Sequence, residues 1–191
     1  MGQPSLKKEK YTYSDYCKWN NEERWELIEG IPYCMASPSR KHQRISGNLF
    51  AQIHNFLFGK ECEVYSAPFD VRLPNKSDEH DKDIETIVQP DISVICDRSK
   101  LDDKGCLGAP DFIIEILSPS TASKDHITKV NLYEKNKVKE YWIVDTENKI
   151  IFIYLLNENK KYSKPIIHDG KGNLDIINIQ GLTINLDLAF N

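Results

Sequence analysis

Asp111-Phe112-Ile113-Ile114-Glu115-Ile116-Leu117 and Glu140-Tyr141-Trp142-Ile143-Val144-Asp145 are two short runs rich in Ile, Val and aromatic residues. A charged segment with a helical pattern, which carries Lys129 and Tyr133, lies between them. Runs of this length and composition are typical of buried strands. We therefore predict a strand, helix, strand unit in which a right-handed crossover joins two parallel strands.

Glu115 lies inside the apolar run from Phe112 to Leu117. An ionised carboxylate on a strand that is buried on both faces costs several kcal/mol unless a cation offsets it. Glu115 is therefore either paired with a buried lysine or a metal ligand.

A second carboxylate precedes this unit. Residues 88–96 predict a strand that is entered through Pro90 and has Asp91 at its first pleat. Because consecutive strands are usually neighbours, we expect Asp91 and Glu115 to face one pocket. Mg²⁺ and Mn²⁺ prefer such oxygen ligands, and a nearby lysine would orient a nucleophile and stabilise negative charge. The other interpretation of Asp91 is a strand-entry residue that bonds to its own backbone.

The remaining elements are predicted from periodicity and turn residues. Apolar residues recur at spacings of three and four from Lys41 to Phe58, which predicts an amphipathic helix that ends at Gly59. Other expected elements are a short helix capped by Ser14, a hairpin over 24–35 turning at Glu29-Gly30, a strand over 61–73 bent at Pro68, polar connections over 75–85 and 97–108, and antiparallel strands near 149–156, 162–168 and 174–179.

Composition limits the class of protein. The 191 residues fit one domain, predicted over 11–191 after a disordered lead-in at 1–10. No apolar run approaches the roughly 18 residues of a membrane span, so we predict no membrane association. The five cysteines are odd in number, widely spaced and without a CxxC pair. This pattern argues against a disulfide framework or a zinc site and favours a cytoplasmic location.

The net charge of −4 argues against a protein that coats nucleic acid nonspecifically. Basic residues nevertheless cluster near His42 and over 124–139. Taken alone, each cluster is more typical of a solvated helix surface than of a nucleic-acid-binding face.

Pro90-Asp91 followed by Glu115-Ile116-Leu117 resembles the metal-binding motif of the PD-(D/E)xK nuclease superfamily. The wider pattern is similar to the bacterial family of "putative restriction endonucleases" of the Uma-two type, over roughly residues 11–156. The matching pieces are Glu26-Leu27-Ile28-Glu29-Gly30, Ser37-Pro38 with His42, Gln89-Pro90-Asp91, Gly108 through Glu115, Ser118-Pro119-Ser120-Thr121, Asp125 with Lys129 and Tyr133, and Glu140 through Asp145.

The resemblance implies an α/β fold with a restriction-endonuclease-like core, in which helices flank a mixed β-sheet and antiparallel hairpins follow at the C-terminal end. It also implies an endonuclease that depends on Mg²⁺ or Mn²⁺ and hydrolyses phosphodiester bonds in DNA. Asp91, Glu115 and the carbonyl of Ile116 would hold the metal. Related nucleases often act as dimers because two DNA strands need two sites, so a homodimer is among the expected assemblies.

One position departs from the superfamily pattern. The motif lysine falls at Leu117, whose side chain cannot replace an ammonium. In similar proteins this role is thought to move to the following helix, where Lys129 matches, although a surface pair with Asp125 is the other interpretation. Glu29 is predicted as a further catalytic acid, with Glu26 competing and a turn-forming role open.

His42 and Lys124 are predicted to contact nucleic acid, a helix-cap or surface role being open for the histidine. Two other functions remain open. The same fold can serve as a nucleic-acid-binding or partner-binding module without turnover, which the acidic net charge and the displaced lysine favour. Hydrolysis of a different phosphate ester is a third, weaker alternative. The sequence leaves open the recognition sequence, the form of DNA, the pathway and the oligomeric state.

Overall fold

The computed structural model describes residues 9–19, 23–76, 78–117 and 124–191, with the backbone alone for 124–126. Within these residues, two six-stranded mixed sheets and one two-stranded sheet form the framework. The predicted α/β class is therefore confirmed, whereas the division into two large sheets was not predicted. The first sheet has the order β12 (Ile166–His168), β11 (Ile150–Leu155), β10 (Glu140–Asp145), β9 (Phe112–Leu117), β6 (Ile92–Ile95) and β3 (Glu63–Ser66).

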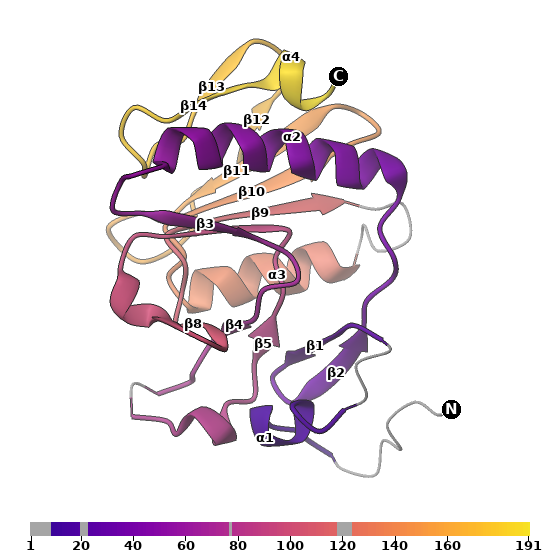
Figure 1. The fold of residues 1–191 in the computed structure, drawn as a ribbon, viewed down its shortest axis with the longest axis vertical. Coiled ribbons are helices and arrows are strands. Elements are labelled where there is room, and N and C mark those ends of the chain that lie inside the picture. Colours follow the sequence, from indigo (N-terminus) through magenta and orange to yellow (C-terminus); the bar gives the residue numbers. More distant parts are fainter. Residues whose placement is uncertain (1–8, 20–22, 77, 118–123) are drawn as a thin grey trace.

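The predicted crossover unit forms the centre of the first sheet (Figure 1). β9 pairs with β10 in parallel, and α3 (Lys124–Lys135) connects them. β6 lies on the other side of β9 and is antiparallel to it. The expected neighbourhood of the Asp91 and Glu115 strands is therefore confirmed.

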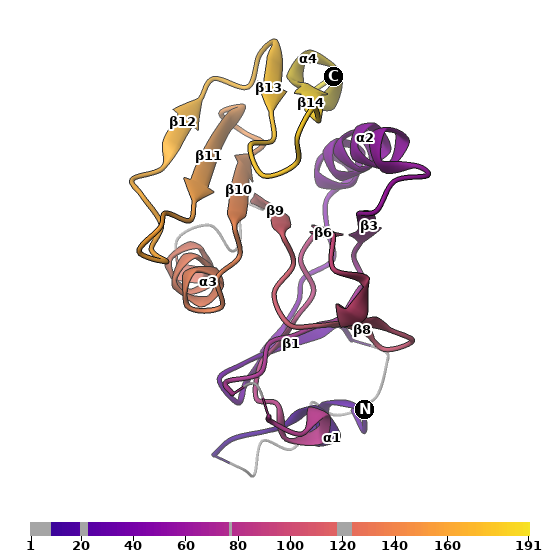
Figure 2. The ribbon, with the colours of Figure 1, turned by 90° about the vertical axis from the view of Figure 1, so that its left-hand side faces the viewer.

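Alternation along β9 divides the interior into two cores. Ile114 and its even-numbered neighbours pack with Leu49 of α2 (Arg40–Leu57), while Ile113 packs with Leu132 of α3. Successive strand side chains point to opposite faces, and Figure 2 shows α2 and α3 on opposite sides of the sheet. Glu115 therefore points to the α3 face. The helix predicted at 41–58 is confirmed, and the Ser39 side chain caps its start.

The second sheet lies below the first in Figure 2. It forms because two segments predicted as long strands each divide between the sheets. The 61–73 segment breaks at the cis peptide Ala67-Pro68, and the 88–96 segment breaks at Pro90, since proline donates no ladder hydrogen bond. The order is β2 (Ile31–Cys34), β1 (Trp25–Ile28), β5 (Ile87–Val88), β4 (Val71–Arg72), β8 (Gly105–Leu107) and β7 (Leu101–Asp102).

Several other boundaries differ from prediction. The 97–108 connection contains the β7–β8 hairpin, where Gly105 has φ +120 and a Cβ would lie 2.2 Å from the Asp70 carbonyl oxygen. Thr12, rather than Ser14, precedes α1 (Tyr13–Tyr16). Residues 1–8 of the predicted lead-in lie outside the described residues, but Lys10 forms an ion pair with Glu85.

The predicted antiparallel C-terminal hairpins are present. β11 pairs with β12, and β13 (Asn173–Asp175) pairs with β14 (Thr183–Asn185). α4 (Leu186–Ala189) then packs beside α2. The short 3-10 helices are η1 (Asp81–Asp83) and η2 (Arg98–Lys100). Among the described residues, no helix has the length and apolar character to cross a membrane.

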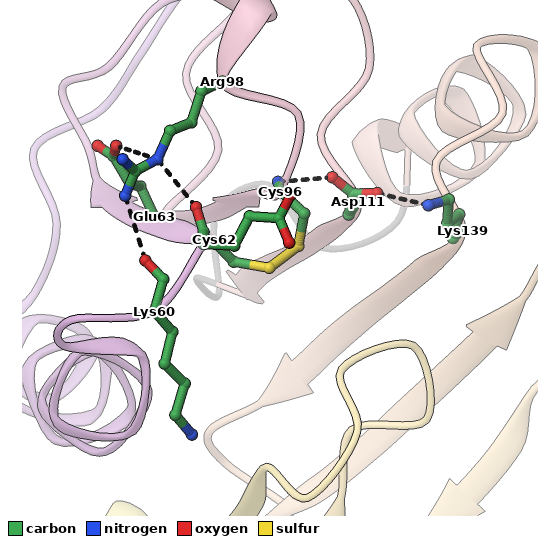
Figure 3. Close-up of a disulfide and its surroundings, with 8 residues drawn as sticks. Lys60, Cys62, Glu63, Cys96, Arg98, Asp111 and Lys139 are labelled. Atoms are coloured by element: carbon green, nitrogen blue, oxygen red, sulfur yellow. Dashed lines mark hydrogen bonds and ion pairs between the residues drawn. A yellow bond between two sulfur atoms is a disulfide. The ribbon is translucent and has the colours of Figure 1, made fainter.

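The cysteine pattern argued against a disulfide framework and gave no sign of the one bond that is present between Cys62 and Cys96 (Figure 3). Glu63 and Ile95 are paired residues of β3 and β6, so the two cysteines directly flank this pair. Counting cysteines cannot reveal such a bond, since it depends on the register of two strands 34 residues apart. The Cys96 amide also donates to Asp111.

Arg72 has a fully buried side chain that bonds to Asp81 and Asp102, each at 2.6 Å. Burial disfavours the charge of Asp81, yet bonds from Lys104 and Arg72 hold its pKa below 3.8. The Arg72 hydrogen bond likewise lowers the pKa of Asp102. A lowered folded pKa contributes stability above the unfolded pKa, and this stability is lost as pH falls.

We therefore expect the double variant Asp81→Asn, Asp102→Asn to lower the free energy of unfolding by about 2 kcal/mol at neutral pH, because the buried guanidinium loses both counter-charges. The difference from wild type should shrink as pH falls below about 4. Urea unfolding across pH measures it. Asp103→Asn, an exposed neighbour, is the control. A constant difference down to pH 2 would contradict the electrostatic origin.

Candidate active site

A cleft of about 400 Å³ lies between the β1–β2 hairpin, the first half of α2 and the ends of β6 and β9. Charged side chains from five separate segments of the chain meet in it. They are Arg24, Glu26, His42, Asp91, Glu115 and Lys129.

Asp91 and Glu115 are neighbours across two strands. β6 and β9 pair with Ile92 opposite Ile114, so continuing the register by one residue sets Asp91 opposite Glu115. Cross-strand neighbours have Cβ atoms about 5 Å apart. Two like charges in this arrangement repel unless cations or donors offset them, and the structure supplies both.

Lys129 holds Glu115 from the opposite side. Its Nζ lies 2.7 Å from Glu115 Oε1 and 2.9 Å from Glu26 Oε1. The Tyr133 hydroxyl donates to the same Glu115 oxygen at 2.7 Å. Lys129 and Tyr133 are four residues apart on α3 and therefore lie on one face of the helix. The structure thus brings Lys129 to the Glu115 strand and favours this over a surface pair.

Asp91 accepts bonds from two other elements. Its Oδ2 lies 2.8 Å from the Ile116 amide nitrogen and 3.1 Å from His42 Nε2. It therefore bonds to the neighbouring strand and not to its own backbone. His42 is 7% exposed and lies against this carboxylate. The geometry supports a role in orienting Asp91 more than the predicted contact with nucleic acid, because the Asp91 carboxylate already occupies Nε2.

The structure does not bring Glu29 to the cleft. Glu29 lies in the β1–β2 turn with φ +51 and pairs with Lys135 on the surface. Glu26 is in the cleft instead. It is 5% exposed, and its Oε1 accepts hydrogen bonds from the backbone amide of Gln89 and from the Lys129 ammonium. Along β1, Glu26 shares a face with Ile28, which explains why it points inward.

Burial and the charges of neighbouring side chains shift the pKa values of Glu115 and Lys129. Burial raises the pKa of Glu115 to about 7, with Asp91 and Glu26 acting in the same direction and Lys129 opposing them. Burial alone would lower the pKa of Lys129, but Glu115 and Glu26 hold it above its ordinary value. Lys129 is therefore charged, and one ammonium is shared by neighbouring carboxyl groups.

His42 shows a similar balance. Burial disfavours its charged form, but the hydrogen bond and charge of Asp91 raise the pKa of His42 above 6.5. Its other ring nitrogen, Nδ1, is buried without a hydrogen-bond partner among the described residues.

Comparison with known proteins identifies the chain. The model of the Uma2 family, described as "Putative restriction endonuclease", matches residues 11–189. The chain belongs to the Uma2 family. A protein from Synechocystis sp. described as "Uncharacterized protein slr1290" is 28% identical over 159 residues, which are 82% of this chain and 80% of that protein.

A solved structure shows the same fold. It is the crystal structure of "a putative nuclease belonging to DUF820" from Anabaena variabilis, with a TM-score of 0.75 and 20% sequence identity over 94% of this chain and 97% of that chain. At this identity the similarity establishes the fold alone. The restriction-endonuclease-like architecture expected from sequence is thus confirmed for this Uma2 protein.

The donor set of this Uma2 chain suits a hard divalent cation. Among the described residues, no three His, Cys, Asp or Glu side chains converge as a metal site. A cation would therefore rest on Asp91, Glu115 and backbone or water oxygens, which is a mixture that Mg²⁺ accepts. Asp91 Oδ2 and Glu115 Oε1 are engaged within the protein. Burial is the main cause of the raised pKa of Glu115, with Asp91 and Glu26 adding to it, and a bound cation would favour the ionised carboxylate.

Several other predicted positions fall where the side chains are not described. Lys124 begins α3, but its side chain and that of Asp125 lie outside the described residues, as do Ser118 through Thr121. The nucleic-acid contact of Lys124 therefore stays a prediction. Tyr133 is the residue whose contact with Glu115 was missed, although its spacing of four from Lys129 was a signal for it.

Proposed function

We propose that this Uma2 protein is a metal-dependent endonuclease that hydrolyses phosphodiester bonds in DNA. The observation that carries the proposal is that Asp91, Glu115, Glu26 and Lys129 line one cleft, in which the Lys129 ammonium contacts both Glu26 and Glu115. The family description and the fold of the nuclease structure support the same class of chemistry. A homodimer would supply one such cleft for each DNA strand.

Asp91 and Glu115, with the carbonyl of Ile116, would hold Mg²⁺ or Mn²⁺. Such a cation lowers the pKa of bound water and offsets charge on a phosphodiester. Other residues of the cleft would orient these ligands and the reacting water. His42 and the Ile116 amide fix the Asp91 carboxylate. Tyr133 fixes Glu115. An ammonium has three donors, and Lys129 uses two on carboxylates. The third has no partner among the described residues and would orient a water or a phosphate oxygen.

The test is incubation of supercoiled, linear and single-stranded DNA with the protein in Mg²⁺, in Mn²⁺ and in EDTA. We expect cleavage in either metal and none in EDTA. Restoring Mn²⁺ to the EDTA sample should restore the cleavage, which controls for inactivation. Equal cleavage in EDTA and in metal would contradict metal dependence, and the absence of cleavage under all conditions would contradict the nuclease proposal.

A second candidate is a binding module on the same fold without turnover. The observation that favours it is Leu117 at the position of the motif lysine, together with the engagement of Lys129 by two carboxylates. Calorimetric Mn²⁺ binding that Glu115→Gln abolishes, in a protein that cleaves none of the DNA forms, would support the binding module.

A further inference from the structure

Among the described residues, three cationic side chains line the cleft, and two of them are neutralised within it. Lys129 contacts Glu26 and Glu115. His42 contacts Asp91. Arg24 differs, because its described partner is the neutral amide of Gln89. The charge of Arg24 is therefore the one that no carboxylate among the described residues compensates.

Gln89 holds the guanidinium firmly. Its Oε1 accepts from Arg24 Nε at 3.0 Å and from Nη2 at 2.9 Å. The orientation of this amide is set at its other end, where Nε2 donates to the Tyr16 hydroxyl at 3.0 Å and to Asp70 Oδ1 at 2.8 Å. Gln89 is 8% exposed. The acceptor is thus a buried oxygen with a fixed direction.

The backbone of Arg24 is fixed as well, since its carbonyl accepts from the Met35 amide across the hairpin. A guanidinium carries five N–H donors. Gln89 takes two of them, and the other three have no partner among the described residues. A planar guanidinium with unused donors can form two parallel hydrogen bonds to the oxygens of a phosphate group.

We propose that Arg24, aligned by Gln89, is the phosphate-binding residue of the cleft and holds a backbone phosphate of the bound DNA strand. This inference rests on the function proposed above. The three carboxylates of the cleft repel a polyanion, and a fixed cation at its wall that no described carboxylate compensates would help to bring a DNA strand close. Arg24 is two residues from Glu26 along an extended segment, which sets their Cα atoms about 7 Å apart. A phosphate on Arg24 therefore lies beside the acidic cluster.

The alternative is a purely structural role, in which the Arg24 to Gln89 bonds only hold the β1–β2 hairpin against β5, its neighbour in the second sheet. The two roles differ in what substitution changes. Loss of a structural bond lowers the melting temperature and leaves DNA affinity alone, whereas loss of a phosphate contact lowers affinity and the number of counterions released on binding.

The experiment measures binding of a fluorescent DNA duplex and of a single strand by anisotropy, in EDTA and over a series of NaCl concentrations. The variants are Arg24→Gln, Arg24→Lys and, as a charge-matched control, Arg98→Gln. Arg98 follows the other end of β6, pairs with Glu63 (Figure 3) and does not line the cleft. We expect Arg24→Gln to weaken binding about tenfold and to reduce the salt slope by about one.

The DNA affinity of Arg24→Lys should lie between those of the wild type and Arg24→Gln, because lysine keeps the charge but cannot form two parallel hydrogen bonds to a phosphate. Arg98→Gln should bind as wild type does. Equal affinities of Arg24→Gln and Arg98→Gln overturn the inference, as does a lowered melting temperature of Arg24→Gln with unchanged affinity. If the wild type cleaves DNA while Arg24→Gln binds normally, the inference alone fails. If the wild type neither binds nor cleaves DNA, the proposed function fails with it.

Discussion

Glu115→Gln is expected to lower DNA cleavage by about a thousandfold or more while the protein stays folded. The side chain is a proposed metal ligand, and an amide cannot supply its charge. The fold should tolerate the change because the amide oxygen can still accept from Tyr133, and Lys129 keeps its contact with Glu26. We expect the free energy of unfolding to change by no more than about 1 kcal/mol. A supercoiled-plasmid assay in Mn²⁺ and urea unfolding measure the two quantities.

The matched control for this result is Glu29→Gln. It makes the same chemical change on a glutamate that the structure sets on the surface, paired with Lys135. It should cleave DNA like the wild type. Cleavage by Glu115→Gln at the wild-type rate, in proteins prepared identically, would remove Glu115 from the site. A loss in Glu29→Gln equal to that in Glu115→Gln would restore Glu29 to the role expected from sequence.

Lys129→Met is expected to abolish cleavage and also to destabilise the fold by about 3 kcal/mol. Lys129 is buried between Glu26 and Glu115, and removing one partner of a buried ion cluster leaves uncompensated charge. The pKa of Glu115, already raised to about 7 by burial, should rise further without the ammonium. The folded state then binds a proton that the unfolded state does not, so the destabilisation should be larger at pH 8 than at pH 6.

Two further variants test this explanation. Lys135→Met changes an exposed lysine of the same helix that pairs with Glu29, and it should alter stability by less than about 0.5 kcal/mol. Adding Glu115→Gln to Lys129→Met removes one of the stranded charges and should restore part of the lost stability, giving a non-additive double-mutant cycle. Strict additivity of the two changes would mean that Lys129 and Glu115 are not energetically coupled.

Much of the candidate site could be predicted because its residues violate local patterns. Glu115 is a carboxylate in an apolar strand, and such a residue requires a partner. Its expected neighbours, Asp91 and Lys129, are indeed beside it. Glu29, predicted as a further acid, lies outside the cleft, whereas its competitor Glu26 lies inside it, and the sequence could not separate the two for a physical reason. All four residues of β1 are buried, so the alternation that would have shown the inward face of Glu26 is hidden.

The second sheet escaped prediction because its strands are too short to show a period. β4, β5 and β7 contain two residues each, and their pairing depends on contacts distant in sequence. The role of Gln89 also depends on contacts distant in sequence. It lies beside Pro90 in the motif, and its side chain forms hydrogen bonds with Arg24, Tyr16 and Asp70. No spacing rule connects these residues, since they come together only through the pairing of strands that are distant in sequence, such as β1 with β5.

The bond between Cys62 and Cys96 makes a covalent ring of the chain between them. That ring leaves the first sheet after β3, passes through β4 and β5 of the second sheet, and returns with Asp91 at the start of β6. When the protein unfolds with the bond intact, this segment remains a closed loop and not a free coil. For a separation of 34 residues, the chain-entropy estimate of the resulting stabilisation is about 4 kcal/mol. The unfolded oxidised protein thus still contains a closed loop, and this loop holds β3 and β6 of the first sheet together with β4 and β5 of the second.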